Sequence, residues 1–134
     1  MTIIVQLVGS HRSGKTLALS RVVRALRRRR LSVVVIKHSH HAIDLAGTDT
    51  DRYVRSGATA VFFASARTVG FLPGDALAWA RRLRPDVVLV EGYHRRRLGT
   101  RFEIDSPDEA TTRAKEIEAF VMRRRNDRAR RGPE

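Results

Sequence analysis

The sequence GSHRSGKT at residues 9–16 decides the fold of this chain, because it matches the pattern G-x-x-x-x-G-K-[ST] of phosphate-binding loops. It follows the apolar, β-branched run Thr2–Val8, which is typical of a buried strand in a parallel sheet. From Gly14 onward, apolar residues recur with the spacing of an amphipathic helix. The motif therefore lies between a strand and a helix, which is the setting in which it binds phosphate.

The chemistry of such a loop depends on its backbone. Glycines let successive N–H groups turn toward one phosphate, and the N-terminus of the following helix adds positive potential. We expect Lys15 to contact the β- and γ-phosphates of a nucleotide and Thr16 to offer its hydroxyl to Mg²⁺. A glycine turn with an incidental lysine is the less favoured interpretation. The residues expected to bind the nucleotide are Gly9, Ser10, His11, Arg12, Ser13, Gly14, Lys15 and Thr16.

The rest of the chain alternates between strand and helix patterns. A second buried strand is predicted over Leu31–Ile36, which completes a right-handed βαβ unit with the first strand and its helix. Further strands are predicted at Thr59–Ala64, Thr68–Leu72, Asp86–Val90 and Phe102–Ile104, and further helices from Asp51, from Asp75 to Pro85, and from a capping box at Ser106-Pro107-Asp108-Glu109. This pattern predicts an α/β protein with a three-layer, P-loop NTPase-like fold, in which helices flank a mostly parallel central sheet.

Length and composition limit the domain count and the chemistry. A chain of 134 residues fits one domain, so we expect a single P-loop nucleotide-binding domain over residues 1–122 and a frayed, basic C-terminal tail over residues 123–134. The absence of cysteine excludes disulfides, thiolate metal sites and cysteine nucleophiles. No apolar run approaches the ~18 residues of a membrane helix, and no signal peptide precedes the first strand, so a cytoplasmic location is expected.

The formal net charge of +13 raises the alternative of a nucleic-acid-binding module. Its arginines cluster at residues 27–30, 95–97 and 123–131. No helix-turn-helix, zinc or stacking-aromatic pattern accompanies them, and only 6% of the residues are aromatic. A solvated arginine-rich surface is therefore the favoured interpretation.

Two groups of polar residues follow predicted strands and are candidates for the same site. Glu91 ends the apolar run Val87–Val90, so it is expected to face the crevice that holds Lys15, where it could bind Mg²⁺ or polarise a water; a glutamate facing solvent is the alternative. After the second strand, Asp49 is the candidate ligand of magnesium or water. Its neighbours are Lys37, His38, His40, His41, Asp44 and Asp51, for which phosphate or partner contact is preferred to a transition-metal site and a solvated loop stays equally open.

Taken in order, these motifs resemble the molybdopterin-guanine dinucleotide biosynthesis protein B (MobB) family. The resemblance runs from about Ile3 to Tyr93 and is carried by the phosphate loop, Ile36-Lys37-His38-Ser39-His40-His41, Gly47-Thr48-Asp49-Thr50, Arg55-Ser56-Gly57-Ala58 and Leu89-Val90-Glu91-Gly92-Tyr93. It implies a GTP-binding, weakly GTP-hydrolysing homodimer that assists a MobA-like guanylyltransferase in attaching GMP to molybdopterin. Carried onto this sequence, the catalytic residues are Lys15, Glu91 and Asp49, and the Mg²⁺ residues are Thr16, Asp49 and Glu91.

The chain departs from the family pattern at several positions. Where the family reads G-K-D-[ST] and E-G-F-K, this chain has Thr48 and His94 in place of the two lysines. Ile104 leads almost directly to Ser106, where family members are generally longer. The guanine motif N-K-x-D is absent, so a preference for guanine rests on the resemblance, and a small nucleotide or small-molecule kinase stays an alternative.

Overall fold

The computed structural model describes residues 1–38, 52–53, 56–57, 61–64, 69–71 and 74–132. The chain divides into two compact units, and each is described by itself. The larger unit comprises Met1–His38 and Arg84–Glu134, and the smaller comprises Ser39–Leu83.

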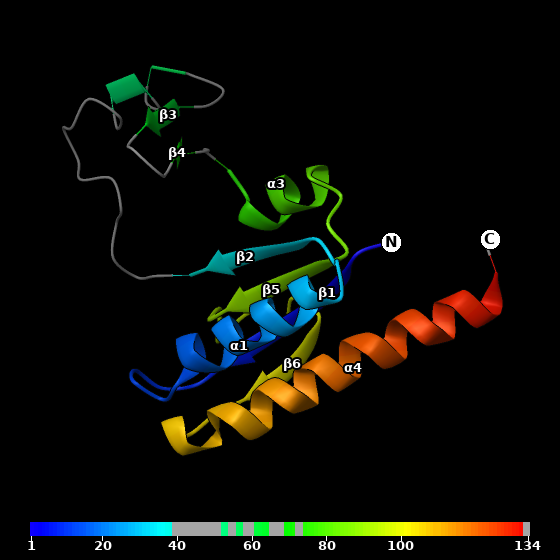
Figure 1. Ribbon diagram of the computed structural model, residues 1–134. Helices are drawn as coiled ribbons and strands as arrows, with labels where there is room; N and C mark the ends of the chain where they lie inside the picture. The colour runs from blue at the N-terminus through cyan, green and yellow to red at the C-terminus, as the bar shows by residue number, and fades with distance from the viewer. Residues whose placement is uncertain (39–51, 54–55, 58–60, 65–68, 72–73, 133–134) are drawn as a thin grey trace. The chain divides into compact units, whose positions relative to one another are not determined.

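A four-stranded, all-parallel sheet forms the centre of the larger unit (Figure 1). Its strands are β1 (Ile3–Val8), β2 (Val33–Lys37), β5 (Val87–Glu91) and β6 (Thr100–Glu103), in the spatial order β2-β5-β1-β6. The predicted α/β fold with a parallel sheet flanked by helices is therefore confirmed. Because all four strands are parallel, their carboxyl ends lie along one edge of the sheet.

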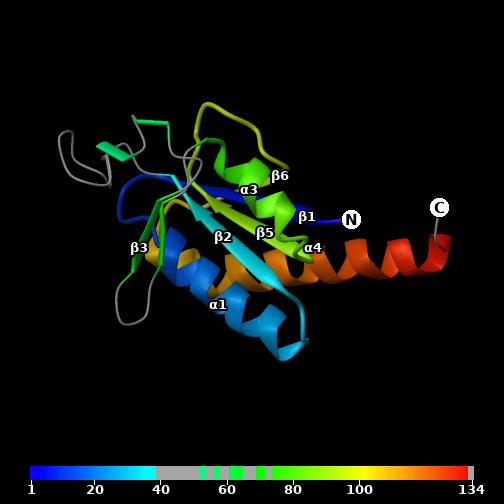
Figure 2. The ribbon, with the colours of Figure 1, turned by 90° about the horizontal axis from the view of Figure 1, so that it is seen from above.

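Two helices, α1 (Lys15–Arg28) and α4 (Ala110–Arg131), pack on the same face of this sheet (Figure 2). Their apolar stripes recur every three or four residues, as an amphipathic helix requires. The stripes consist of Ala18, Leu19, Val22 and Leu26 on α1 and of Ala110, Ala114, Ile117 and Val121 on α4. They join the inward-facing residues of β1 and β5, namely Ile3, Val5, Leu7, Val87 and Leu89, in one buried core.

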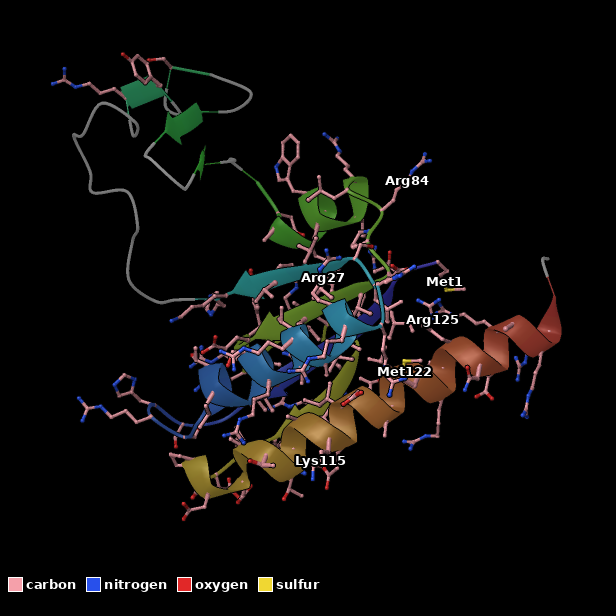
Figure 3. All side chains as sticks on the ribbon, viewed as in Figure 1. Met1, Arg27, Arg84, Lys115, Met122 and Arg125 are labelled. Carbon is pink, nitrogen blue, oxygen red and sulfur yellow. The ribbon has the colours of Figure 1, made fainter. Side chains whose placement is uncertain are left out.

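The C-terminal segment differs most from the structure that the sequence predicts. Residues from 123 onward were expected to fray, but α4 continues to Arg131. Contacts with the amino ends of the strands hold this part of the helix, since Arg125 lies 3.6 Å from the Asp86 carboxylate and Arg128 donates to the carbonyl of Met1 at 2.6 Å (Figure 3). Charge excludes a segment from the core, but it does not prevent a helix that has partners.

The start of α4 also differs in detail. Ser106 caps the segment as predicted, but its hydroxyl accepts from the N–H of Asp108, so a short 3₁₀ turn, Pro107–Glu109, precedes the helix. The Glu109 carboxylate accepts from Asp105 N instead of closing the capping box on Ser106.

The smaller unit contains a separate two-stranded antiparallel sheet, β3 (Val61–Ala64) and β4 (Val69–Phe71), and the helix α3 (Ala76–Arg82). Asp75 caps α3 as predicted, since its carboxylate accepts from Ala78 N at 3.0 Å. The helix predicted from Asp51 lies mostly outside the described residues. None of the helices in the described part of the chain combines the length and apolarity needed to span a membrane.

The loop between β1 and α1 lies directly against the connection between β6 and α4. A Cβ atom on Gly9 would come within 2.3 Å of the carbonyl oxygen of Ile104, and one on Gly14 within 2.7 Å of Pro107 Cα. Gly14 also has a φ of 93°, which disfavours any side chain. Gly9 is thus required by packing, and Gly14 by both packing and backbone conformation.

Replacing Gly14 with alanine should therefore lower stability through both strain and overlap, by about 2–4 kcal/mol. Gly57→Ala is the matched control, because Gly57 has a φ of 99° but nothing within 4 Å of its Cβ position. Chemical denaturation of the two variants measures the difference. Equal destabilisation would show that the contact with Pro107 contributes nothing.

The carboxylate of Asp86 links β5 to the start of β2. The backbone N–H and the hydroxyl of Ser32 donate to it at 2.7 and 2.9 Å, and together with Arg125 they hold the pKa of Asp86 below its usual value of 3.8. A depressed pKa means that the ionised form stabilises the fold above the unfolded pKa, and that this contribution is lost as the pH falls through the folded value.

Asp86→Asn should lower the melting temperature at pH 7, and the difference from wild type should shrink below pH 3.8. A difference that does not vary with pH would contradict this assignment.

Candidate phosphate-binding site

The N-terminus of α1 has features that favour an anion. No side chain caps it, and its first turn contains no acidic residue. The first N–H groups of a helix have no partners within the helix, and they carry the positive end of its dipole. The loop that leads to them turns tightly, with Arg12 at a φ of 58° and a hydrogen bond from Ser13 N to Ser10 O of 3.2 Å. This geometry is suited to binding a phosphate group.

Lys15, the first residue of α1, folds back across the loop. Its ammonium donates to the carbonyl oxygens of Gly9 and Ser10, each at 2.8 Å. No carboxylate of the described residues pairs with it. The structure thus places a cation at the loop without an acidic neighbour to neutralise it, and its role toward phosphates stays a prediction.

Ser13 is the most unusual polar group of the loop. It is 2% exposed, and its Oγ has no hydrogen-bond partner among the described residues. Buried hydroxyl groups nearly always have a partner, and an unsatisfied one costs about 1–3 kcal/mol. The hydroxyl lies close to Gly9, where a Cβ would come within 2.5 Å of it. A ligand that accepts a hydrogen bond inside the loop would satisfy this group.

Glu91 lies beside the loop, as the sequence predicts. It is the last residue of β5 and pairs with Leu7 of β1 on one side and with Lys37 of β2 on the other. Its side chain is buried, which excludes the alternative of a glutamate facing solvent. The hydroxyl of Thr16 donates to Glu91 Oε1 at 3.3 Å. The structure therefore brings together a hydroxyl and a carboxylate, which are the oxygen donors that Mg²⁺ prefers in proteins.

The candidates after β2 are only partly described. Lys37 ends that strand, and His38 follows it, with its backbone N–H donating to Glu91 O at 2.9 Å and its ring 4.2 Å from that of Tyr93. The remaining candidates, His40, His41, Asp44, Asp49 and Asp51, lie outside the described residues. Over the described ranges, no three histidine, aspartate or glutamate side chains gather as a metal site. Of the three predicted Mg²⁺ residues, the structure brings together Thr16 and Glu91.

Sequence reasoning missed two features around the site. The segment 104–107 packs against Gly9 and Gly14 of the loop between β1 and α1. Nothing in the sequence of this segment distinguishes it from an ordinary connection. Gln6, a buried residue in the middle of β1, binds the segment that follows Glu91. The sequence signal for this contact was the single polar residue inside the apolar run IIVQLV. A polar side chain buried in such a strand needs hydrogen-bond partners.

Comparison with known proteins agrees with this architecture. The profile of the family "Molybdopterin guanine dinucleotide synthesis protein B", MobB, matches residues 4–122. No match is found among curated proteins.

Several solved structures share the fold. The crystal structure of Bacillus subtilis MobB has a TM-score of 0.55 and 24% identity, covering 76% of this chain and 67% of the other. A crystal structure of molybdopterin-guanine biosynthesis protein B (mobB) has a TM-score of 0.54 and 22% identity, covering 88% of this chain and 99% of the other. A MobB homologue from Bacillus stearothermophilus has a TM-score of 0.52 and 26% identity, covering 84% and 70% of the two chains. The profile match spans most of the sequence, and so the chain belongs to the MobB family of molybdopterin guanine dinucleotide synthesis.

Proposed function

We propose that this protein binds GTP with Mg²⁺ through residues 9–16 and assists the guanylyltransferase that forms molybdopterin guanine dinucleotide. One observation carries the nucleotide-binding part of the proposal. The uncapped N-terminus of α1, the unpartnered hydroxyl of Ser13 and the ammonium of Lys15 all belong to the short segment 9–16. Each is a hydrogen-bond donor, which favours an acceptor-rich anion such as a polyphosphate.

The donor set beside the loop fits Mg²⁺. Thr16 and Glu91 would hold the ion, with Asp49 as a further candidate, and the ion would neutralise charge on the phosphates. Because Glu91 is buried, solvent and salt would screen its attraction to a nearby cation less than that of an exposed carboxylate.

Hydrolysis of the bound nucleotide should be slow. P-loop GTPases position the attacking water with a glutamine and stabilise the transition state with an arginine. Gln6 is the single glutamine of the chain, and it is fully buried, with both ends of its amide hydrogen-bonded to the backbone. It therefore cannot orient a water at the phosphates. This supports a weak GTPase that acts through binding, as the family resemblance implies.

The remaining parts of the proposal rest on family membership. These are the preference for guanine, the partnership with a MobA-like protein or with molybdopterin, the homodimer and a cytoplasmic location. Membership of the MobB family supports a role in molybdopterin guanine dinucleotide synthesis. The geometry of residues 9–16 supports only the phosphate-binding part of the proposal.

Lys15→Ala should weaken binding of GTP with Mg²⁺ at least tenfold, because it removes a charge-assisted hydrogen bond at the phosphates. Isothermal titration calorimetry with GTP, ATP and GDP measures the loss and the base preference together. Lys115→Ala is the matched control, since Lys115 is an exposed lysine on α4 (Figure 3). Binding that survives Lys15→Ala unchanged would remove the loop from the proposal.

Glu91→Gln should reduce the gain in nucleotide affinity that Mg²⁺ provides, while affinity measured in a chelator stays close to that of wild type. The reason is that an amide replaces the buried anionic donor next to Thr16. Glu103→Gln removes the same charge from an exposed residue at the end of β6 and should leave the Mg²⁺ dependence intact. Equal Mg²⁺ dependence in wild type and Glu91→Gln would contradict the assignment of Glu91.

A further inference from the structure

The segment from Gly92 to Leu98, here called the Gln6-held loop, is fixed to the sheet by one buried side chain. Gln6 is fully buried in β1. Its amide nitrogen lies within hydrogen-bond distance of three carbonyl oxygens and its amide oxygen accepts one N–H, the partners being Gly92 O at 2.9 Å, Tyr93 O at 3.0 Å, Arg96 O at 2.8 Å and Leu98 N at 3.1 Å. A connection of this length normally moves freely over the surface, whereas this one is held at four points along its path.

Both ends of the loop are also fixed, by a backbone hydrogen bond and by packing. At its start, Gly92 N donates to Leu7 O at 3.0 Å, and the ring of Tyr93 lies 4.2 Å from that of His38. At its end, Leu98 is buried, and a Cβ on the following Gly99 would come within 2.4 Å of Ile4 O. Tyr93 has a φ of 60°, which is costly for an aromatic residue. Hydrogen bonds and packing thus hold the loop at both ends and along its path, and they keep Tyr93 in a strained backbone conformation.

This fixed loop presents cations. His94, Arg95, Arg96 and Arg97 are all exposed. Arg96 lies over the ring of Tyr93, 5.9 Å from its centre. Within the described ranges, the side chains of Arg95 and Arg97 have no ion-pair or hydrogen-bond partner. Adjacent like charges repel one another, so a rigid display of this kind lowers stability unless an anion occupies it.

The loop also begins at the candidate nucleotide site. Gly92 follows Glu91 directly, and Glu91 contacts Thr16 of α1. The start of the loop thus lies at the same edge of the sheet as residues 9–16, while Gln6, which alternates with the core residues Val5 and Leu7, holds the rest of the loop over the face of the sheet opposite α1. Arginine on a pre-organised backbone binds phosphate with less loss of entropy than arginine on a mobile one.

We propose that the Gln6-held loop is a second phosphate-binding element, in which Arg95 and Arg97 contact a phosphate group and Gln6 is the positioning residue. Two sources of that phosphate share this chemistry: the bound nucleotide itself, for which the inference rests on the proposed function, and a separate phosphomonoester beside it. Arg95 and Arg97 contact the ligand directly. Gln6 acts through them, by fixing the loop that carries them.

The test compares two double variants of equal charge. Arg95→Ala/Arg97→Ala removes the loop cations, and Arg123→Ala/Arg124→Ala removes two exposed arginines from α4. One arm titrates phenyl phosphate into each double variant in a Lys15→Ala background, which disables residues 9–16. The other arm titrates GTP with Mg²⁺ into each double variant with Lys15 intact. The loop variant should bind about tenfold more weakly than the α4 variant in at least one arm.

The arms separate the two sources. A loss with phenyl phosphate alone identifies a separate phosphomonoester, and a loss with GTP alone identifies the nucleotide. Because the phenyl phosphate arm does not use Lys15, a failure of GTP binding would leave it informative. Equal affinities of the two double variants in both arms would overturn the proposal.

Gln6→Leu tests the positioning role with both arginines present. It should lose phosphate affinity to about the same extent as the loop variant, and trypsin should cleave it faster after Arg95 to Arg97, while circular dichroism shows the same secondary structure as wild type. Unchanged affinity in a folded Gln6→Leu protein would overturn the role of Gln6. If Gln6→Leu does not fold, Arg95→Ala/Arg97→Ala still decides whether the loop binds phosphate, because both arginines are exposed.

Discussion

The register between β1 and β5 is the constraint on which the rest of the site depends. The two strands run parallel with Leu7 opposite Glu91, so β5 ends where β1 enters the loop at residues 9–14. A shift by one residue would turn Glu91 to the other face of the sheet, away from α1. Because the alternate residues Val5, Leu7, Val87 and Leu89 are fully buried against the helices, the core fixes this register. Hydrophobic packing thus sets the distance between Thr16 and Glu91.

The same edge of the sheet is assembled from segments that are far apart in sequence. Residues 104–107 support the loop from one side, and this requires glycine at positions 9 and 14. Gln6 fixes the segment after Glu91 from within β1. In the first case main-chain groups lie so close that a side chain could not intervene, and in the second a side-chain amide binds main-chain carbonyls. The site is therefore built largely from backbone, which suits the recognition of phosphate by N–H groups.

Much of this fold could be predicted, because its local signals agree with one another. The apolar run before the loop, the helical spacing after it and the carboxylate that ends the run 87–91 were sufficient to place Lys15, Thr16 and Glu91 at one edge. The course of residues 123–131 could not be predicted, since their helix depends on tertiary contacts with Asp86 and Met1. The role of Gln6 was hidden for the same reason: its partners lie more than 80 residues away in sequence. Asp49 lies outside the described residues and stays a prediction.

The central claim is that residues 9–16 form a phosphate site completed by Glu91. A crystal structure with a non-hydrolysable GTP analogue and Mg²⁺ tests it most directly. The account predicts phosphate density at the N-terminus of α1, with the Ser13 hydroxyl and the Lys15 ammonium in contact with it and the metal beside Thr16 and Glu91. Density for the nucleotide elsewhere, with Lys15 still bonded to the carbonyls of Gly9 and Ser10, would contradict it.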